Sequence, residues 1–446
     1  MTPNTKTWLD RSLSLISDVR PGEGATALLL AANVFFLLAA YSVLKVVRES
    51  LILAEGGAVT KSYAAAGQAA LLLVFVPLYG AFASRVNRRW LVCGVTLFFA
   101  SHLLVFVALG LAGIRIGLAF YLWIGIFNMV VIAQFWAFTN DLFTPDRGRR
   151  LLPVVGIGAS LGAVVGAGLT SIVFARVGPF LLMLVSAAGL FIPIGLTMWV
   201  SRREKTSGSD AAAASADAPL RKAGGFHLIV RERYLLLIAL LMVVLNLVNT
   251  IGEFLFARMV QTHAVALVAS GASGGLGTRE LIGTMVGGMQ TWVNAIGFVF
   301  QLFLASRVLA YAGVRGALFV LPVVALASYS MMALFPVFGI VKMAKILENS
   351  TDYSIQNTTR HALFLPTSRE AKYKAKQAID SFFVRTGDLL QAVVVFAGTA
   401  LSLDPTQFAA LNVVFVGLAL VLVTLIGREY AARTTAHGDV SLRQAA

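Results

Sequence analysis

The stretch Val341–Asp388 reads VKMAKILENSTDYSIQNTTRHALFLPTSREAKYKAKQAIDSFFVRTGD. It begins as a hydrophobic helix whose polar side chains recur every three or four residues and so share one helical face: Lys342, Lys345, Asn349, Asp352 and Gln356. A basic turn follows, and the hydrophobic pattern then resumes with Arg385 and Asp388. Polar groups within a hydrophobic helix usually face a water-filled path or a partner charge. The stretch therefore indicates a solute path.

The composition of the whole chain fits a membrane protein. Of its 446 residues, 58% are hydrophobic and 13% are charged, and its mean hydropathy is +0.82. Soluble domains carry about 25% charged residues, and a helix needs about 20 apolar residues to cross a bilayer. We expect an all-α polytopic membrane protein. The lone Cys93 lies in a hydrophobic run, so no disulfide framework and no cysteine metal cluster is expected. No other metal site and no cofactor is predicted.

Twelve hydrophobic runs predict twelve transmembrane helices. The runs fall into two sets of six, which predicts an N-terminal bundle over residues 1–200 and a C-terminal bundle over 233–446. Residues 201–232, which include TSGSDAAAASADAP, are expected to form a flexible cytoplasmic linker. The predicted spans lie near 25–54, 62–83, 90–112, 115–140, 151–174, 179–200, 233–258, 281–304, 316–335, 337–364, 377–403 and 406–427.

The distribution of Lys and Arg predicts the orientation. Most of the 36 basic residues fall in segments on the same side as both termini, and cytoplasmic loops are enriched in such residues. Both termini are therefore expected in the cytoplasm, with the chain in a bacterial inner membrane. This bias also accounts for most of the net charge of +15 without a nucleic-acid partner. Residues 1–24 lack the apolar core of a cleavable signal.

The two halves show the signs of a parallel repeat. Ala83-Ser84-Arg85-Val86 recurs 222 residues later as Ala305-Ser306-Arg307-Val308, and Arg147 corresponds at that shift to Arg369. Such a repeat predicts two six-helix bundles related by an axis along the membrane normal. The segment GAFASRVNRR at 80–89 resembles the loop between the second and third helices of the major facilitator superfamily, with Ser84 in place of its usual Asp. The resemblance implies the fold of that superfamily.

Charged residues within the spans are the candidates for function. In the first span, Lys45, Arg48 and Glu49 either lie at the membrane interface or form the cationic wall of a cavity. In the seventh span, Asn249 and Glu253 share a face, and Glu253 could pair with a cation or carry a proton. In the tenth span, Lys342 and Arg360 lie roughly 30 Å apart along a helix. They cannot both be interface residues, so some of these charges must face the interior.

A longer pattern resembles the ATP/ADP translocase family of nucleotide transporters. It lies in TDYSIQNTTRHALFLPTSREAKYKAKQAIDSFFVRTGD, and shorter matches lie in VLKVVRESL, in FWAFTNDLFTPDRGRRLLPVVGIGASLGAVVG and in NLVNTIGEFLF. The family's basic residues in the first and tenth helices correspond to Arg48 and Arg360. Its seventh-helix Glu corresponds to Asn249, with Glu253 one turn later, and His361 stands where the family usually has Glu. The resemblance implies transport of a nucleotide-like anion.

We therefore predict a secondary transporter, not an enzyme, that exchanges an anionic nucleotide-like solute, either ATP and ADP or a nucleotide against phosphate. It is expected to act as a monomer in the lipid bilayer. The predicted solute-binding residues are Lys45, Arg48, Lys345, Arg360 and Arg385. Charge pairing or coupling is predicted for Glu49, Glu253, Asp352 and Asp388, and polar cavity positions are predicted for Asn249, Lys342, Asn349 and Gln356. A proton-coupled carrier of another organic anion and a non-transport assembly protein remain alternatives.

Overall fold

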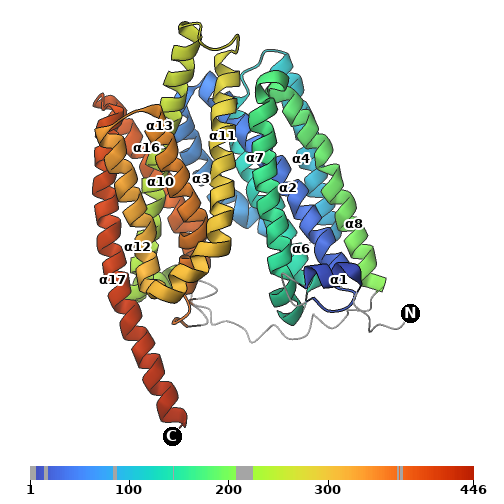
Figure 1. Ribbon diagram of the computed structural model, residues 1–446, viewed down its shortest axis with the longest axis vertical. Helices are drawn as coiled ribbons and strands as arrows, with labels where there is room; N and C mark the ends of the chain where they lie inside the picture. The colour runs from blue at the N-terminus through green and yellow to red at the C-terminus, as the bar shows by residue number, and fades with distance from the viewer. Residues whose placement is uncertain are drawn as a thin grey trace. The chain divides into compact units, whose positions relative to one another are not determined.

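The computed structural model describes residues 7–14, 19–83, 88–143, 145–206, 225–368, 371 and 375–445, and their regular structure is helical (Figure 1). The predicted linker lies largely outside this part of the chain, as do Ser84-Arg85-Val86 and Arg369 of the repeat. The elements, with π-helices written η, are α1 (Trp8–Leu13), α2 (Gly24–Glu55), α3 (Gly57–Ala83), α4 (Arg88–Leu111), α5 (Gly117–Phe127), η1 (Asn128–Ile132), α6 (Ala133–Leu142), α7 (Pro145–Gly189), α8 (Phe191–Thr206), α9 (Gly225–Arg231), α10 (Arg233–Ala269), α11 (Thr278–Val299), η3 (Phe300–Leu304), α12 (Ala305–Leu334), α13 (Phe338–Thr351), η4 (Asp352–Gln356), α14 (Asn357–Ala362), α15 (Lys376–Ala378), η6 (Ile379–Phe383), α16 (Val384–Ala400) and α17 (Pro405–Ala445).

Nine helical segments within the described residues are long and apolar enough to cross a membrane. Two of them, Arg150–Arg203 and Thr278–Leu334, are each long enough for two spans. Each is broken at a glycine with left-handed backbone, Gly178 (φ 69°) and Gly313 (φ 65°). The segment from α13 to α14 is also helical, but its charged residues exclude it from the nine apolar segments. Each of the twelve predicted spans thus has its helix, and the all-α polytopic prediction is confirmed.

Internal contacts group the chain into two units that do not follow a single cut in the sequence. Unit 1 holds α2, α4 to α8, the part of α3 from Phe75 onward and the start of α11 up to Thr291. Unit 2 holds α3 up to Val74, most of α10, the rest of α11 and the elements from η3 to α17. The domain boundaries at 200 and 233 stay a prediction.

Unit 1 is built on close packing of α2 against α7, which run side by side (Figure 1). Gly158, Gly162 and Gly166 lie four residues apart on one face of α7. A β-carbon at each would collide with the backbone of α2, at Ala31, Phe35 and Ala39 respectively. Small residues at this spacing let two helix backbones approach closely within a membrane. The glycine series therefore serves the α2–α7 contact.

The start of unit 1 is tied down by two carboxylates. The Asp10 carboxylate accepts hydrogen bonds from the N–H groups of Gly22 (3.1 Å) and Gly24 (2.9 Å), and from Thr7. Burial raises the pKa of Asp10, but these hydrogen bonds outweigh it and lower the pKa to about 2. Asp10 thus holds α1 against the first turn of α2.

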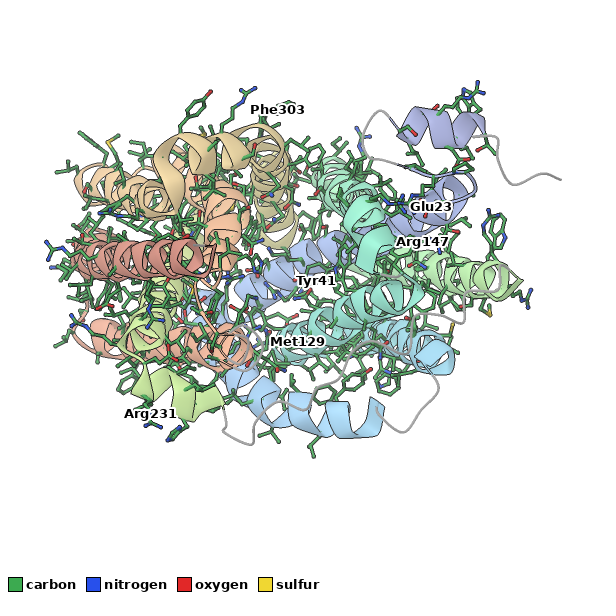
Figure 2. All side chains as sticks on the ribbon, turned by 90° about the horizontal axis from the view of Figure 1, so that it is seen from below. Glu23, Tyr41, Met129, Arg147, Arg231 and Phe303 are labelled. Carbon is green, nitrogen blue, oxygen red and sulfur yellow. The ribbon has the colours of Figure 1, made fainter. Side chains whose placement is uncertain are left out.

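Glu23 is the second carboxylate, and it ties α2 to the basic start of α7. Both oxygens of Glu23 accept from the Arg150 guanidinium, at 2.7 and 3.0 Å. Arg147 lies 3.6 Å from the same carboxylate, and Figure 2 shows the Glu23 and Arg147 side chains next to each other. Burial raises the pKa of Glu23, but the hydrogen bonds from Arg150 and the charges of both arginines lower it overall.

The glycine contact predicts opposite effects for two alanine substitutions in α7. Gly162→Ala should destabilise the protein by about 1–3 kcal/mol, because the new methyl group meets the Phe35 carbonyl. Gly156→Ala has open space around its β-carbon, so it should stabilise the helix by up to about 1 kcal/mol. Unfolding of the purified variants in detergent, followed by differential scanning fluorimetry, measures both. Equal midpoints for the two variants would contradict this packing.

The Asp10 contacts predict that α1 detaches only in strong acid. A carboxylate whose pKa is lowered on folding, here from 3.8 to about 2, contributes stability at pH values above 3.8. That stability is lost as the pH falls from 3.8 through about 2. A spin label at Trp8→Cys, in a Cys93→Ser background, should stay immobilised down to about pH 4. It should become mobile at neutral pH in Asp10→Ala but not in Ser12→Ala. An immobile label in Asp10→Ala would refute the assignment.

Candidate functional site

The most buried charge within the described residues belongs to Lys345 in α13, whose side chain is 0% exposed. Its Nζ donates to Glu348 Oε2 at 2.8 Å and to Asn249 Oδ1 at 2.8 Å. It also lies 3.7 Å from Glu253 Oε1. The helical spacings place these groups together, since Lys345 and Glu348 are three residues apart in α13, and Asn249 and Glu253 are four apart in α10. An enclosed ammonium group thus has both charge and hydrogen-bond partners, as burial requires.

A tyrosine from α12 also contacts the Glu348 carboxylate. The Tyr329 hydroxyl is fully buried and lies 2.6 Å from Glu348 Oε2. It is also 3.2 Å from the backbone carbonyl of Val248. A β-carbon at Gly252 would collide with the Tyr329 hydroxyl, so a glycine is needed where α10 passes this ring. The Glu348 carboxylate therefore has two strong partners, one charged and one neutral.

Glu253 connects the buried pair to a second lysine. Its Oε1 accepts from Asn349 Nδ2 at 2.9 Å, and its Oε2 lies 3.6 Å from Lys61 Nζ in α3. Glu253 keeps 32% of its side chain exposed, whereas Lys61 is almost buried. The seven residues that make these contacts are called the Lys345 cluster below: Lys61, Asn249, Glu253, Tyr329, Lys345, Glu348 and Asn349. Two lysines and two glutamates balance its charge.

Two further ion pairs of unit 2 involve predicted solute-binding residues. Arg385 donates to Asp388 at 3.2 Å, and Asp388 also accepts from Asn246 in α10 at 2.8 Å. Arg360 lies 3.7 Å from Asp380, which also accepts from Lys376 at 2.8 Å. The side chains of Arg385 and Arg360 are 31% and 29% exposed. They are therefore more accessible cations than Lys345.

In unit 1, the predicted cations lie on α2. Arg48 pairs with Glu49, its neighbour in the chain. Its guanidinium also lies over the ring of Tyr121 in α5, 4.4 Å from the ring centroid, a cation–π arrangement that stabilises a desolvated arginine. Lys45 lies one turn earlier on α2 and is half-buried.

The remaining predicted positions do not follow one α-helical face. Residues 352–356 form the π-helix η4, in which hydrogen bonds run from residue i to i+5. This wider turn shifts the register between Lys345 and Gln356. Lys342 and Asp352 are half-buried, while Gln356 is buried. The regular stripe expected from the sequence is therefore interrupted at Asp352.

Of the predicted site residues, Asn249, Glu253, Lys345 and Asn349 lie together in one cluster. Three members of that cluster were not among the predicted site residues. Glu348 could have been identified, because it stands three residues after Lys345 in the same helix. Lys61 and Tyr329 come from other helices, and no local spacing in the sequence points to them.

Two cavities lie elsewhere in the described structure. One, of about 550 Å³, is in unit 1 and is lined almost entirely by aromatic and aliphatic side chains of α3, α4, α5 and η1. The other, of about 530 Å³, is in unit 2 near the start of α3 and is lined by polar groups that include Arg258 and Gln261. None of the predicted solute-binding residues lines either cavity.

Comparison with known proteins gives sequence relatives that are all nucleotide carriers by name. The ADP,ATP carrier protein 1 of Chlamydia pneumoniae is 21% identical over 71% of this chain and 68% of its own length. The carriers of the same name from Chlamydia muridarum and Chlamydia trachomatis are 20% and 19% identical, and the matches span 61% and 60% of their lengths. The chain is a distant homologue of the chlamydial ADP,ATP carrier proteins. No protein-family model matches it.

Comparison with solved structures establishes the fold of this distant homologue. The nucleoside transporter NupG matches with a TM-score of 0.63 at 13% identity, over 90% of this chain and 98% of that one. A POT family transporter in complex with 5-aminolevulinic acid matches with a TM-score of 0.64 at 11% identity, over 97% and 99%. A bacterial homologue of the lysosomal transporter Spinster matches with a TM-score of 0.61 at 15% identity, over 92% and 98%. The chain has the major-facilitator fold.

The relatives and solved structures named above are all carriers or transporters by name. In the described part of the chain, no group of three or more His, Cys, Asp or Glu side chains is arranged to hold a metal ion. The chain is an integral membrane protein with many spans.

The Lys345 cluster predicts a non-additive stability cycle. Lys345→Met leaves Glu348 without a charge partner, and Glu348→Leu leaves Lys345 only the longer contact with Glu253. Each should destabilise the protein by about 3–5 kcal/mol. The double variant removes both charges and should recover most of this loss. Arg233→Gln breaks an exposed pair with Glu429 and should cost less than about 1 kcal/mol. Unfolding midpoints of the four variants test the cycle. Additive losses in the double variant would show that the two charges do not form a pair.

Proposed function

We propose that the chain is a secondary transporter that exchanges an anionic, nucleotide-like solute by alternating access. The observation that carries the proposal is the Lys345 cluster, in which a fully buried cation is held by groups from α10, α12 and α13. Ionisable groups at such depth are costly and commonly mark a solute or ion path. Distant homology to ADP,ATP carriers supports a nucleotide as the solute.

The proposed binding chemistry is an exchange of partners. Arginine binds phosphate through its bidentate fork, and lysine acts as a point charge. The five predicted binding cations are Lys45, Arg48, Lys345, Arg360 and Arg385. Carboxylates lie beside Arg48, Lys345, Arg360 and Arg385. A bound phosphate would take the place of these carboxylates. Arg360 and Arg385 would receive it first, because they are partly exposed.

Glu253 gives this exchange a physical advantage. It lies between two lysines, 3.7 Å from Lys345 and 3.6 Å from Lys61. When an anion draws Lys345 away, Glu253 keeps Lys61 as its charge partner, and Glu348 keeps the hydrogen bond from the Tyr329 hydroxyl. The cost of uncompensated charge in a low-dielectric interior is thereby lowered. Coupled entry and exit of two anions keeps the charge balanced in the same way.

The rest of the proposal concerns the setting of the site. We infer two six-helix domains, residues 1–200 and 233–446, joined by a cytoplasmic linker at 201–232. A monomer would lie in a bacterial inner membrane with both termini in the cytoplasm. The major-facilitator fold supports rocking of two bundles about a midplane site. Asp352 and Asp388 would serve as charge partners in the state without solute.

Exchange is tested in liposomes. Purified protein in vesicles loaded with ADP should take up labelled ATP, and vesicles without internal nucleotide should take up little. Arg360→Gln and Arg385→Gln should each reduce uptake about tenfold or more, because a hydrogen bond to a charged group contributes about 1.5–3 kcal/mol. Arg233→Gln, at an exposed pair remote in sequence from these residues, serves as the matched control.

The same vesicles separate the alternatives. Uptake driven by an imposed pH gradient without internal solute would replace exchange by proton-coupled transport of an anion, with Glu253 or Asp352 as the proton site. Absence of uptake with any internal nucleotide or phosphate, together with a stable co-purifying protein, would replace transport by an assembly role.

A further inference from the structure

Two buried glutamines stand out among the described residues, because both polar atoms of each side-chain amide lack a hydrogen-bond partner there. They are Gln134, which is 6% exposed, and Gln356, which is 3% exposed. Other buried amides of the described residues lack a partner on one atom only, as Gln391 does. An amide offers two donor hydrogens and two acceptor lone pairs, so these two positions leave the whole hydrogen-bonding capacity of the group unused.

Such an arrangement is costly, because an unpaired amide loses its hydrogen bonds to water and gains none in return. Leucine would fill a similar volume without this loss. Polar groups that fold at such a cost are expected at functional sites rather than in a stable core. The two amides are therefore expected to find partners in another state of the protein.

The two glutamines are also equivalent in the internal repeat. Gln356 follows Gln134 by 222 residues, which is the shift that relates Ala83-Ser84-Arg85-Val86 to its second copy. Gln134 precedes Arg147 by the same number of residues as Gln356 precedes Arg369. The fourth and tenth spans thus carry the same residue at the same place, each within its own unit. One unpaired amide could be an accident of packing, but two at matching positions are harder to explain in that way.

Each glutamine also adjoins a π-helix. Gln134 is the second residue after η1, and Gln356 is the last residue of η4. Short π-helical turns inside α-helices are frequent at functional sites. Conversion of such a turn to α-helix shifts the register by one residue, which rotates the side chains beyond it by about 100°. A buried amide beside a π-turn can therefore be turned toward a new partner without unfolding the helix.

We propose that Gln134 and Gln356 each bind, within their own unit, the uncharged, hydrogen-bonding edge of the solute, while cations of the same unit bind its phosphates. This inference rests on the proposed function and adds to it the recognition of the base. A glutamine amide presents a donor and an acceptor side by side, the pattern that matches the edge of adenine. Phosphate contacts provide affinity for many anions, whereas an amide contact distinguishes one base from another.

The test uses Gln134→Leu and Gln356→Leu in the full-length protein, with unfolding temperature measured alone and with saturating ATP or inorganic triphosphate. Without ligand, each variant should unfold at the wild-type temperature or above it, because an unpaired polar group has been removed. The apparent affinity for ATP, from titration of the shift, should fall about tenfold, while that for triphosphate should stay within twofold. Gln391→Leu is the matched control, since it loses the hydrogen bond from Gln391 Nε2 to Ser62 at 2.9 Å and should unfold at a lower temperature.

The outcomes separate this inference from the proposed function. A lowered unfolding temperature in both glutamine variants, as in Gln391→Leu, would overturn the inference, because the amides would then be paired in the resting protein. Equal loss of ATP and triphosphate affinity would overturn it as well. If the wild-type protein responds to neither ligand and exchanges no nucleotide, the proposed function fails. The unfolding temperatures of the variants then still decide whether the amides are unpaired.

Discussion

The constraint on which this structure depends is the cost of a charge in a low-dielectric interior. Lys345 is fully enclosed, so its position requires Glu348 on its own helix, Asn249 on α10 and, through Glu348, the hydroxyl of Tyr329 on α12. Those contacts fix how three helices of unit 2 pack, and Gly252 provides the space that the tyrosine needs. The polar cluster therefore determines the packing around it, whereas in unit 1 the contact of α2 with α7 depends on glycines along its length, with the pair of Glu23 and Arg150 at its start.

Three charge pairs of the predicted binding cations share a feature that suits a solute path. The partners of Arg48, Lys345 and Arg385 lie one or three residues away on the same helix. A pair within one helix can open by a change of side-chain rotamer, whereas a pair between helices needs the helices to separate. An incoming anion can therefore replace a carboxylate while the helices stay in place. Glu253, which bridges α10 to α3 and α13, and the pair of Arg360 with Asp380 instead join different helices and would sense movement between them.

The sequence predicts features that depend on local spacing and misses those that depend on tertiary contacts. Apolar runs predict all twelve spans, since each run alone must satisfy the bilayer. The spacing of Gly158, Gly162 and Gly166 indicates a close helix contact but does not reveal that α2 is the partner. Lys345 and Glu253 are predicted as site residues because they are rare charges in apolar runs. Lys61 and the π-helix η4 escape prediction, because the ion pair and the widened turn arise only when several helices pack together.

The position of Asn249 shows how the charge balance constrains what the site can bind. The resemblance to the ATP/ADP translocase family implies a glutamate at this position, whereas here the amide of Asn249 accepts a hydrogen bond from Lys345 and an acid follows one turn later at Glu253. A glutamate at 249 would add a third negative charge to a cluster that holds two lysines. With asparagine the cluster stays neutral, and Glu253 is placed where it reaches both Lys345 and Lys61. The acid of α10 therefore lies one turn beyond Asn249, where a single carboxylate is within reach of both lysines.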